Sequence, residues 1–214
     1  MGSAKRAEAE SAAHLRFMES MDRIARAIQT ADNVEQLMTD CLDLMLSLFD
    51  CDRAYLVYPM DPDAPTWTAP MERCRPGYPG TLELGLEVPM DSGVANTFRL
   101  LLAADGPLTF GPGGDHPFRG TVPEQFGIKS NIATALHPKK GKPWQFGLHQ
   151  CSYARTWTRA EAHLLAEIGH RLADSLSTQL AEIELQESEA RYREIFDNVS
   201  DLSLIHISEP TRPY

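Results

Sequence analysis

The sequence has no long apolar run and no basic cluster. A helix that spans a bilayer needs about 20 apolar residues in a row, and no stretch of this chain supplies them. Residues 1–16 are rich in alanine, glutamate, lysine and arginine, unlike a secretory signal. The 30 acidic residues outnumber the 20 basic ones, whose largest group is Lys139, Lys140 and Lys142. Because nucleic acids and anionic membranes attract clustered positive charge, we expect neither partner and place the protein in the cytoplasm.

Motifs that carry chemistry are also scarce. The four cysteines, Cys41, Cys51, Cys74 and Cys151, have neither close pairing nor zinc-type spacing, so we expect reduced thiols. The glycine run at 111–114 lacks the Gly-Lys-Ser/Thr ending of a phosphate loop. No set of nucleophile, base and orienting group can be assembled from linear motifs, and the histidine-box and ATP-binding motifs of a kinase core are missing. We therefore expect that this chain is not an enzyme.

The apolar residues instead follow the periods of helices and strands. With 214 residues, 43% of them hydrophobic, the chain can bury one core and carry a further fragment. Helical spacing covers residues 8–29, a segment capped by Asp32 with Glu35 at its third position, and a segment capped by Asp91 or Ser92. Period-two alternation predicts strands at 51–59, 81–88, 127–138 and 144–151, with a short strand at 107–110. This order predicts an α+β fold: a central antiparallel sheet with helices packed on it.

Two of these strands show the alternation most clearly. In strand 81–88, Leu82, Leu84, Leu86 and Val88 share one face. In strand 144–151, Trp144, Phe146 and Leu148 alternate with Gln145, Gly147 and His149. Between the strands predicted at 51–59 and 81–88 lies a loop that holds five of the 15 prolines. This excludes a helix or a central strand there.

After the last predicted strand, the apolar spacing predicts a long helix. Thr158 and Glu161 form a capping box, and a wide apolar stripe follows at Leu164, Leu165, Ile168, Leu172 and Leu176. After Leu176 the stripe narrows to Leu176, Leu180 and Ile183, which fits either the seam of a coiled coil or a solvated helix end. We expect a homodimer through the terminal helices, with this long C-terminal helix as the signalling output.

The chain resembles a known family in two places. The segment KPWQFGLHQCSYARTWTRAEAHLLAEIGHRLADSL resembles the end of a GAF domain, in which a Trp-x-x-Gly-Leu strand leads through an Arg-x-Trp-Thr turn into the last helix. CDRAYLVYPMDPDAP and MERCRPGYPG resemble the first strand and following loop of GAF domains in bacterial sensor histidine kinases. The resemblance covers residues 10–180 and implies a GAF-like sheet. It also implies a sensory input domain that binds a small molecule, or responds to a partner, and relays this to an output domain.

The remaining segments suggest domain boundaries. Residues 187–201, ESEARYREIFDNVSD, are similar to the opening of a PAS domain, and LSLIHISEPTR resembles the translation of a sequencing-library adapter. We expect a disordered N-terminus at 1–9, the GAF domain at 10–180, a coiled-coil linker with the start of a truncated PAS domain at 181–201, and an artefactual tail at 202–214. Two alternatives stay open: a dimerisation and spacer module that binds no ligand, or the input domain of a diguanylate cyclase or other PAS-containing regulator.

The sequence also suggests where a ligand would bind. The resemblance to bilin-binding members stops at residues 121–124, where Thr-Val-Pro-Glu stands in place of their Cys-His pair, so we expect no covalent bilin. The cyclic-nucleotide signature Asn-Lys-x-Phe-Asp-Glu is missing as well, and the ligand stays unknown. We expect a pocket between the sheet and loops 59–80 and 111–120. The candidate ligand-binding residues are Tyr58, Trp67, Arg73, Ser130, Trp144, His149 and Cys151.

The pair His149 and Cys151 has two interpretations. Two residues apart on one strand, they share a face, and both side chains can bind metals or haem iron. Two ligands do not complete a site, and no third is evident. We therefore favour a structural polar patch and expect no metal.

Overall fold

The computed structural model describes residues 2–139 and 141–178, together with positions 181, 185 and 188. Five strands form an antiparallel sheet in the order β3-β1-β7-β6-β5, and β2 pairs with β4 beside it. The expected α+β architecture is confirmed. The elements are α1 (Gly2–Thr30), α2 (Val34–Phe49), β1 (Arg53–Val57), β2 (Thr66–Trp67), β3 (Met71–Cys74), β4 (Val88–Pro89), α3 (Ser92–Ala103), β5 (Leu108–Phe110), α4 (Val122–Gln125), β6 (Ser130–Leu136), β7 (Trp144–Gln150) and a helix at 159–178.

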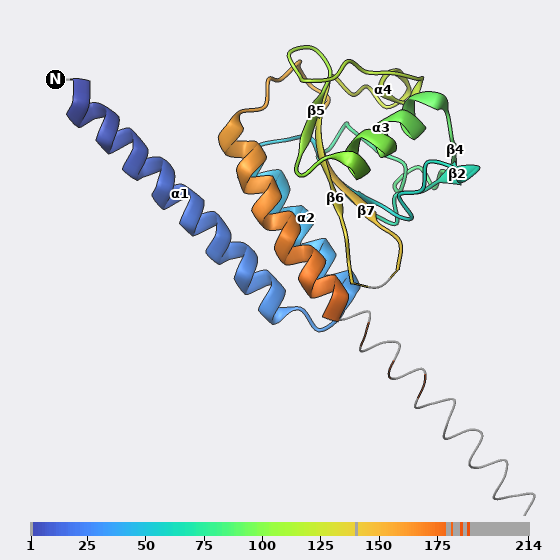
Figure 1. Ribbon diagram of the computed structural model, residues 1–214, viewed down its shortest axis with the longest axis horizontal. Coiled ribbons are helices and arrows are strands. Elements are labelled where there is room, and N and C mark those ends of the chain that lie inside the picture. Colours follow the sequence, from blue (N-terminus) through green and yellow to red (C-terminus); the bar gives the residue numbers. More distant parts are fainter. Residues whose placement is uncertain (1, 140, 179–180, 182–184, 186–187, 189–214) are drawn as a thin grey trace, which may run out of the picture.

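Both faces of the sheet are covered. Figure 1 shows α1, α2 and the helix at 159–178 on one face, and α3 with α4 and the connecting loops on the other. In β1, Ala54 and Leu56 join the core under the first group of helices, while Tyr55 and Val57 join the core under α3. Alternation along the strand therefore assigns each side chain to one of two separate cores.

The helix at 159–178 begins as the sequence predicts. The backbone N–H of Thr158 donates to Glu161 Oε2 at 2.7 Å, and the N–H of Glu161 donates to Thr158 Oγ1 at 3.2 Å, which completes the capping box. The stripe is buried, with Leu165, Ile168, Leu172 and Leu176 fully covered. Leu176 thus belongs to the core of the domain. Leu180, Ile183, the PAS-like segment and the tail at 202–214 lie outside the described residues.

The N-terminal helices differ from the expected boundaries. Helix α1 starts at Gly2, so residues 2–9, which we expected to be disordered, are helical. The cap of α2 is Asn33 and not Asp32, because Asn33 Oδ1 accepts the N–H of Gln36 at 2.9 Å. Both residue types can cap a helix, and the chain uses the second of the two adjacent candidates.

The expected strand at 81–88 is wrong. Residues 81–85 form turns, and only Val88–Pro89 forms a strand. The backbone N–H groups of Leu84 and Leu86 donate to the carbonyls of Gly80 and Thr81, so local bonds replace a sheet ladder. Leu82, Leu84 and Leu86 are consequently 46%, 51% and 39% exposed. The proline-rich loop instead supplies the edge strand β3, which pairs with β1 between Pro70 and Pro76.

Across the described part of the chain, every helix is too short or too polar to cross a membrane.

Candidate functional site

A cavity of about 80 Å³ lies on the sheet face that α3 covers. This space is large enough for several water molecules, each of which needs about 10–15 Å³. Its walls come from all five strands of the main sheet, from α3, and from both loops that the sequence suggested. The lining residues are Arg53, Tyr55, Val57, Glu72, Phe110, Asn131, Gln145 and His149 from the sheet, Val94, Thr97 and Phe98 from α3, and Trp67, Ala69, Thr81, Phe118, Arg119, Val122, Pro123, Phe126 and Ile128 from the loops and short elements.

Arg53 places a full charge inside the protein. Its side chain is only 2% exposed, and a buried charge is costly unless it is paired and hydrogen-bonded. The Nη2 group donates to the carbonyls of Tyr78 and Pro79 at 3.1 and 2.6 Å, and Nε lies 3.7 Å from Glu72 Oε1. The guanidinium therefore joins β1 to the 78–79 turn and to β3.

His149 lies opposite Arg53 in the β1–β7 register. Its Nδ1 is 3.2 Å from Arg53 Nη1, and because a guanidinium only donates, Nδ1 must accept and the ring is neutral. Burial, reinforced by the charge of Arg53, holds the pKa of His149 well below its usual value. The ring also stacks on Tyr55 with centroids 4.2 Å apart. His149 is thus fixed in one tautomer, with Nε2–H as its remaining donor.

Glu72 is the acidic residue of the cavity wall. Burial raises the pKa of its carboxyl, and the charge of Arg53 and the backbone N–H groups of Leu82 and Thr81 oppose that rise. Oε2 accepts the N–H of Leu82 at 3.1 Å. Glu72 therefore anchors the turn that begins at Gly80 to the edge of the cavity.

The residues of a second polar group in the cavity wall are hydrogen-bonded to one another. Tyr55 donates its hydroxyl proton to Asn131 Oδ1 at 3.1 Å and accepts from Gln145 Nε2 at 3.0 Å. These three residues come from β1, β6 and β7 and form a bonded row across the sheet. Burial raises the pKa of Tyr55 above its usual value, so the phenol keeps its proton and the row stays neutral.

Two of the seven candidate residues line this cavity, namely Trp67 and His149. Tyr58 and Trp144 stack on each other in the opposite core, with centroids 4.3 Å apart. Trp144 and His149 differ by an odd number of positions on one strand, so they point to opposite faces.

The other three candidates also lie elsewhere. Arg73 pairs with Asp43 of α2 at 3.2 Å, and Ser130 Oγ accepts the N–H of Arg155 at 2.8 Å. Cys151 is buried beside the Phe126 carbonyl, at 4.0 Å. Among the residues that the structure describes, no three His, Cys, Asp or Glu side chains gather as metal ligands.

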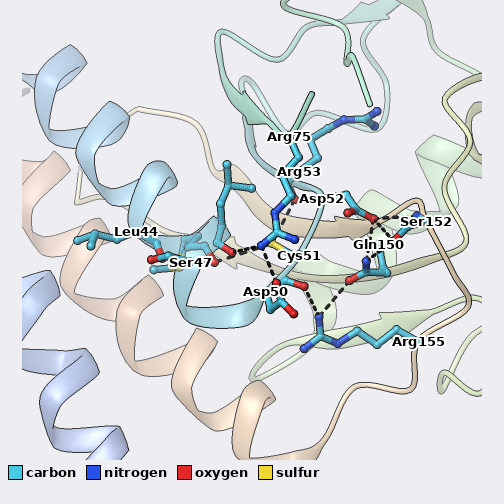
Figure 2. Close-up of polar contacts among 12 residues, drawn as sticks. Leu44, Ser47, Asp50, Cys51, Asp52, Arg53, Arg75, Gln150, Ser152 and Arg155 are labelled. Atoms are coloured by element: carbon cyan, nitrogen blue, oxygen red, sulfur yellow. Dashed lines mark hydrogen bonds and ion pairs between the residues drawn. The ribbon is translucent and has the colours of Figure 1, made fainter. Parts of the chain in front are cut away.

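A polar network connects the end of the sheet to the last helix, as Figure 2 shows. Asp52 Oδ2 accepts from Gln150 Nε2, the N–H of Cys151 and the N–H of Ser152, at 2.7 to 2.8 Å. Gln150 Oε1 in turn accepts from Arg155 Nη1 at 3.0 Å. Burial opposes ionisation of Asp52, but these hydrogen bonds outweigh it and hold its pKa below the usual value.

Arg155 extends the network into the helix cap. Its Nη1 also donates to the Asp50 carbonyl at 3.1 Å, and its Nη2 contacts Glu161 of the capping box at 2.5 Å. The guanidinium lies 4.3 Å from the centroid of Trp157, a cation–π distance. Asp52 and Gln150 each lie one position from a residue of the cavity wall, Arg53 and His149 respectively, so the network begins where the cavity ends.

Three solved structures have a similar fold. A phycoerythrobilin-bound GAF domain from a cyanobacterial phytochrome matches with a TM-score of 0.62 and 17% identity, over 79% of this chain and 98% of that one. The GAF domain of a phosphoenolpyruvate-protein phosphotransferase from Coxiella burnetii matches with a TM-score of 0.60 and 12% identity, over 81% and 98%. The fold is that of a GAF domain. The GAF domain of a protein described as a sensor histidine kinase from Pseudomonas syringae pv. tomato matches with a TM-score of 0.54 and 15% identity, over 88% and 99%.

The two searches by sequence add no further relative. No protein-family model matches the chain, and no curated protein matches it. At these identities the solved structures establish the GAF fold, and the function has to be argued from the cavity and its surroundings.

The position of His149 makes stability depend on pH. Since its folded-state pKa lies below about 6.5, the value in an unfolded chain, the unfolded state binds more protons between the two values. The stability that neutral His149 contributes is present above pH ~6.5 and is lost as the pH falls toward the folded pKa, with a slope of up to about 1.4 kcal/mol per pH unit. Urea unfolding at pH 7.5, 6.5 and 5.5 should show a shallower dependence for His149→Gln than for wild type.

The control for this prediction is His137→Gln, which changes an exposed histidine and should keep the wild-type slope. Comparing variant with wild type cancels the contribution of other groups such as Glu72. Equal slopes for wild type and His149→Gln would show that His149 titrates in the folded protein as it does in the unfolded chain.

Proposed function

We propose that this chain is a ligand-binding input domain of a cytoplasmic signal-transduction histidine kinase. In this proposal a small molecule occupies the cavity under α3, and the helix at 159–178 carries the response onward. The observation that carries the proposal is the cavity itself, in which aromatic walls surround a buried cluster of Arg53, Glu72 and His149. Apolar pockets with a few placed polar groups are typical of small-molecule sites, whereas a spacer module needs only a filled interior.

The role proposed for the chain is binding and not catalysis. A covalent bilin forms no part of it, because residues 121–124 offer no thiol and α4 begins there. The kinase context rests on the resemblance of the sequence to sensor-kinase GAF domains, and the described fold of the Pseudomonas syringae domain is consistent with it. The PAS-like residues after 187 would then begin the next domain of a longer protein.

The polar network supplies a physical route for the response. A ligand that moves Arg53 or His149 displaces β1 and β7, whose next residues are Asp52 and Gln150. Gln150 holds Arg155, which holds Glu161 in the helix cap. The route requires two arrangements of this helix that are close in free energy, because a ligand shifts an equilibrium only by its differential affinity for the two states.

Filling the cavity should abolish binding without unfolding the domain. Ala69 is buried in the cavity wall, so Ala69→Leu places three further carbon atoms in the space a ligand would use. In a thermal-unfolding screen of small metabolites against the full chain, at least one compound should raise the Tm of wild type with increasing concentration. The same compound should leave Ala69→Leu unchanged.

Ala103→Leu is the matched control, because it adds the same atoms at an exposed position of α3, and it should respond like wild type. The binding proposal fails if no compound raises the Tm of wild type. It fails equally if Ala69→Leu responds to the same compounds as strongly.

The proposed partner is a second copy of the chain, bound through the terminal helices. Phe17 of α1 stacks on His163 of the helix at 159–178, with centroids 5.3 Å apart, so the two helices are in contact. Figure 1 shows the N-terminal half of α1 extending away from the sheet. Near the middle of α1, Leu15 and Met18 are 59% and 52% exposed, and their i, i+3 spacing places them on one side of the helix.

The double variant Leu15→Glu with Met18→Glu should therefore convert a dimer to a monomer in analytical ultracentrifugation. Because both side chains are exposed, the free energy of unfolding of the monomer should change by no more than about 0.5 kcal/mol. Leu84→Glu, an exposed leucine outside the terminal helices, should stay dimeric. A wild-type chain that is monomeric at high micromolar concentration, or a dimeric double variant, would refute this interface.

A further inference from the structure

Three residues that line the cavity each carry a buried polar atom with no hydrogen-bond partner. Among the described side chains, five buried nitrogen or oxygen atoms lack one: Arg53 Nε, Trp67 Nε1, Thr81 Oγ1, Trp144 Nε1 and Trp157 Nε1. The first three belong to residues that line the cavity. Their residues are 2%, 8% and 4% exposed. Arg53 Nε is ion-paired with Glu72 Oε1 at 3.7 Å, but this distance is too long for a hydrogen bond. Because native proteins rarely leave buried polar groups unpaired, three in one cavity indicate a bonding partner that the chain does not supply.

The unpaired atoms share one chemical property, which is that each can donate. The Nε–H of an arginine and the Nε1–H of a tryptophan are donors only, and a threonine hydroxyl can donate. The neighbouring row of Tyr55, Asn131 and Gln145 is bonded within itself. The atoms left over therefore require a partner that accepts hydrogen bonds.

The charges around the cavity favour an anion. Arg53 and Arg119 line it with two positive charges, and Glu72 is the one acidic residue among the lining side chains. His149 is neutral because its Nδ1 accepts from Arg53. The walls are otherwise apolar and aromatic, with Phe98, Phe110 and Phe118 among them. One monovalent anion balances these charges, and an apolar group attached to it would lie against the phenylalanines.

We propose that the cavity binds a small organic carboxylate whose oxygens accept from Arg53, Trp67 and Thr81. This inference rests on the proposed function and adds the chemical class of the ligand. A carboxylate only accepts, through two oxygens with about four lone-pair positions, and it matches both the donors and the charge. Inorganic phosphate carries more negative charge and has no apolar part for the aromatic walls.

The probes for the test share one ring and differ in the head group. Benzoate, benzamide and benzylamine present a carboxylate, a neutral amide and an ammonium group, and inorganic phosphate serves as the anion without a ring. Dissociation constants are measured on the full chain by NMR titration. Benzoate should bind at least about tenfold more tightly than each of the other three, since hydrogen bonds to a charged acceptor are the stronger ones.

Two nearly isosteric variants test the donors. Trp67→Phe removes the indole N–H and Thr81→Val removes the hydroxyl, and each should weaken benzoate binding by about tenfold. Both should keep or raise the Tm of the free protein, because each removes a buried polar atom that has no partner there. Trp144→Phe is the control: it removes an equally unpaired N–H in the other core, and it should leave benzoate binding unchanged.

The possible results separate the ligand class from the proposed function. The carboxylate is excluded if benzamide, benzylamine or phosphate binds as well as benzoate, or if Trp67→Phe and Thr81→Val bind benzoate like wild type. If benzoate does not bind while another metabolite stabilises wild type but not Ala69→Leu, the class is wrong and the binding function stands. If no compound binds, both are wrong.

Discussion

The charge of Arg53, enclosed in the protein, is the constraint on which the arrangement of the cavity depends. Removing one partner of a buried charge pair costs about 3–5 kcal/mol, so the chain has to supply Arg53 with acceptors from several directions. It does so with the Tyr78 and Pro79 carbonyls, Glu72 and the neutral ring of His149. These acceptors come from the 78–79 turn, β3 and β7. The edge strand, the turn and the centre of the sheet are thereby held around one guanidinium.

The same strands serve two purposes because a sheet has two faces. On one face Leu56, Phe146 and Leu148 are fully buried beneath the terminal helices and form a closed core. On the other face Arg53 and Tyr55 of β1 and Gln145 and His149 of β7 present polar groups that bound the cavity. Asp52 and Gln150, at the ends of these strands, bond to each other and through Arg155 to the helix cap. A chain of hydrogen bonds therefore links residues next to the cavity wall to the cap of the helix at 159–178, although the cavity and this helix lie on opposite sides of the sheet.

Much of the fold could be predicted because it follows from local rules. Period-two alternation located β1, β6 and β7, and the Thr158 and Glu161 pair located the start of the last helix. The leucines of 81–88 misled because alternation indicates a strand only where a sheet edge is available for pairing. There the backbone bonds are local, and Gly85 adopts a positive φ of 64°, which suits a turn.

The candidate site was predictable in position but only partly in its residues. The loops pointed to the correct side of the sheet, and Trp67 and His149 do line the cavity. Tyr58 and Trp144 could have been rejected from sequence, since their parity along β1 and β7 is opposite to that of Tyr55 and His149. Arg53 has the correct parity and could have been proposed on that basis. Glu72 could not, because the proline-rich sequence does not indicate strand β3, whose pairing with β1 sets Glu72 opposite Tyr55. Thr81 could not, because a turn brings it there and no periodic pattern specifies that turn.

The central claim is that one face of the sheet carries a ligand site and the other a closed core. The tryptophan side chains test this claim directly. The chain has three tryptophans, and the indole N–H of each is buried and unpaired. Only Trp67 lies in the cavity wall, whereas Trp144 and Trp157 belong to the helical core. In a two-dimensional ¹⁵N–¹H NMR spectrum, titration with benzoate should shift the indole resonance of Trp67 and leave the other two in place. A Trp67 resonance that stays fixed, or equal shifts of Trp144 and Trp157, would contradict this account.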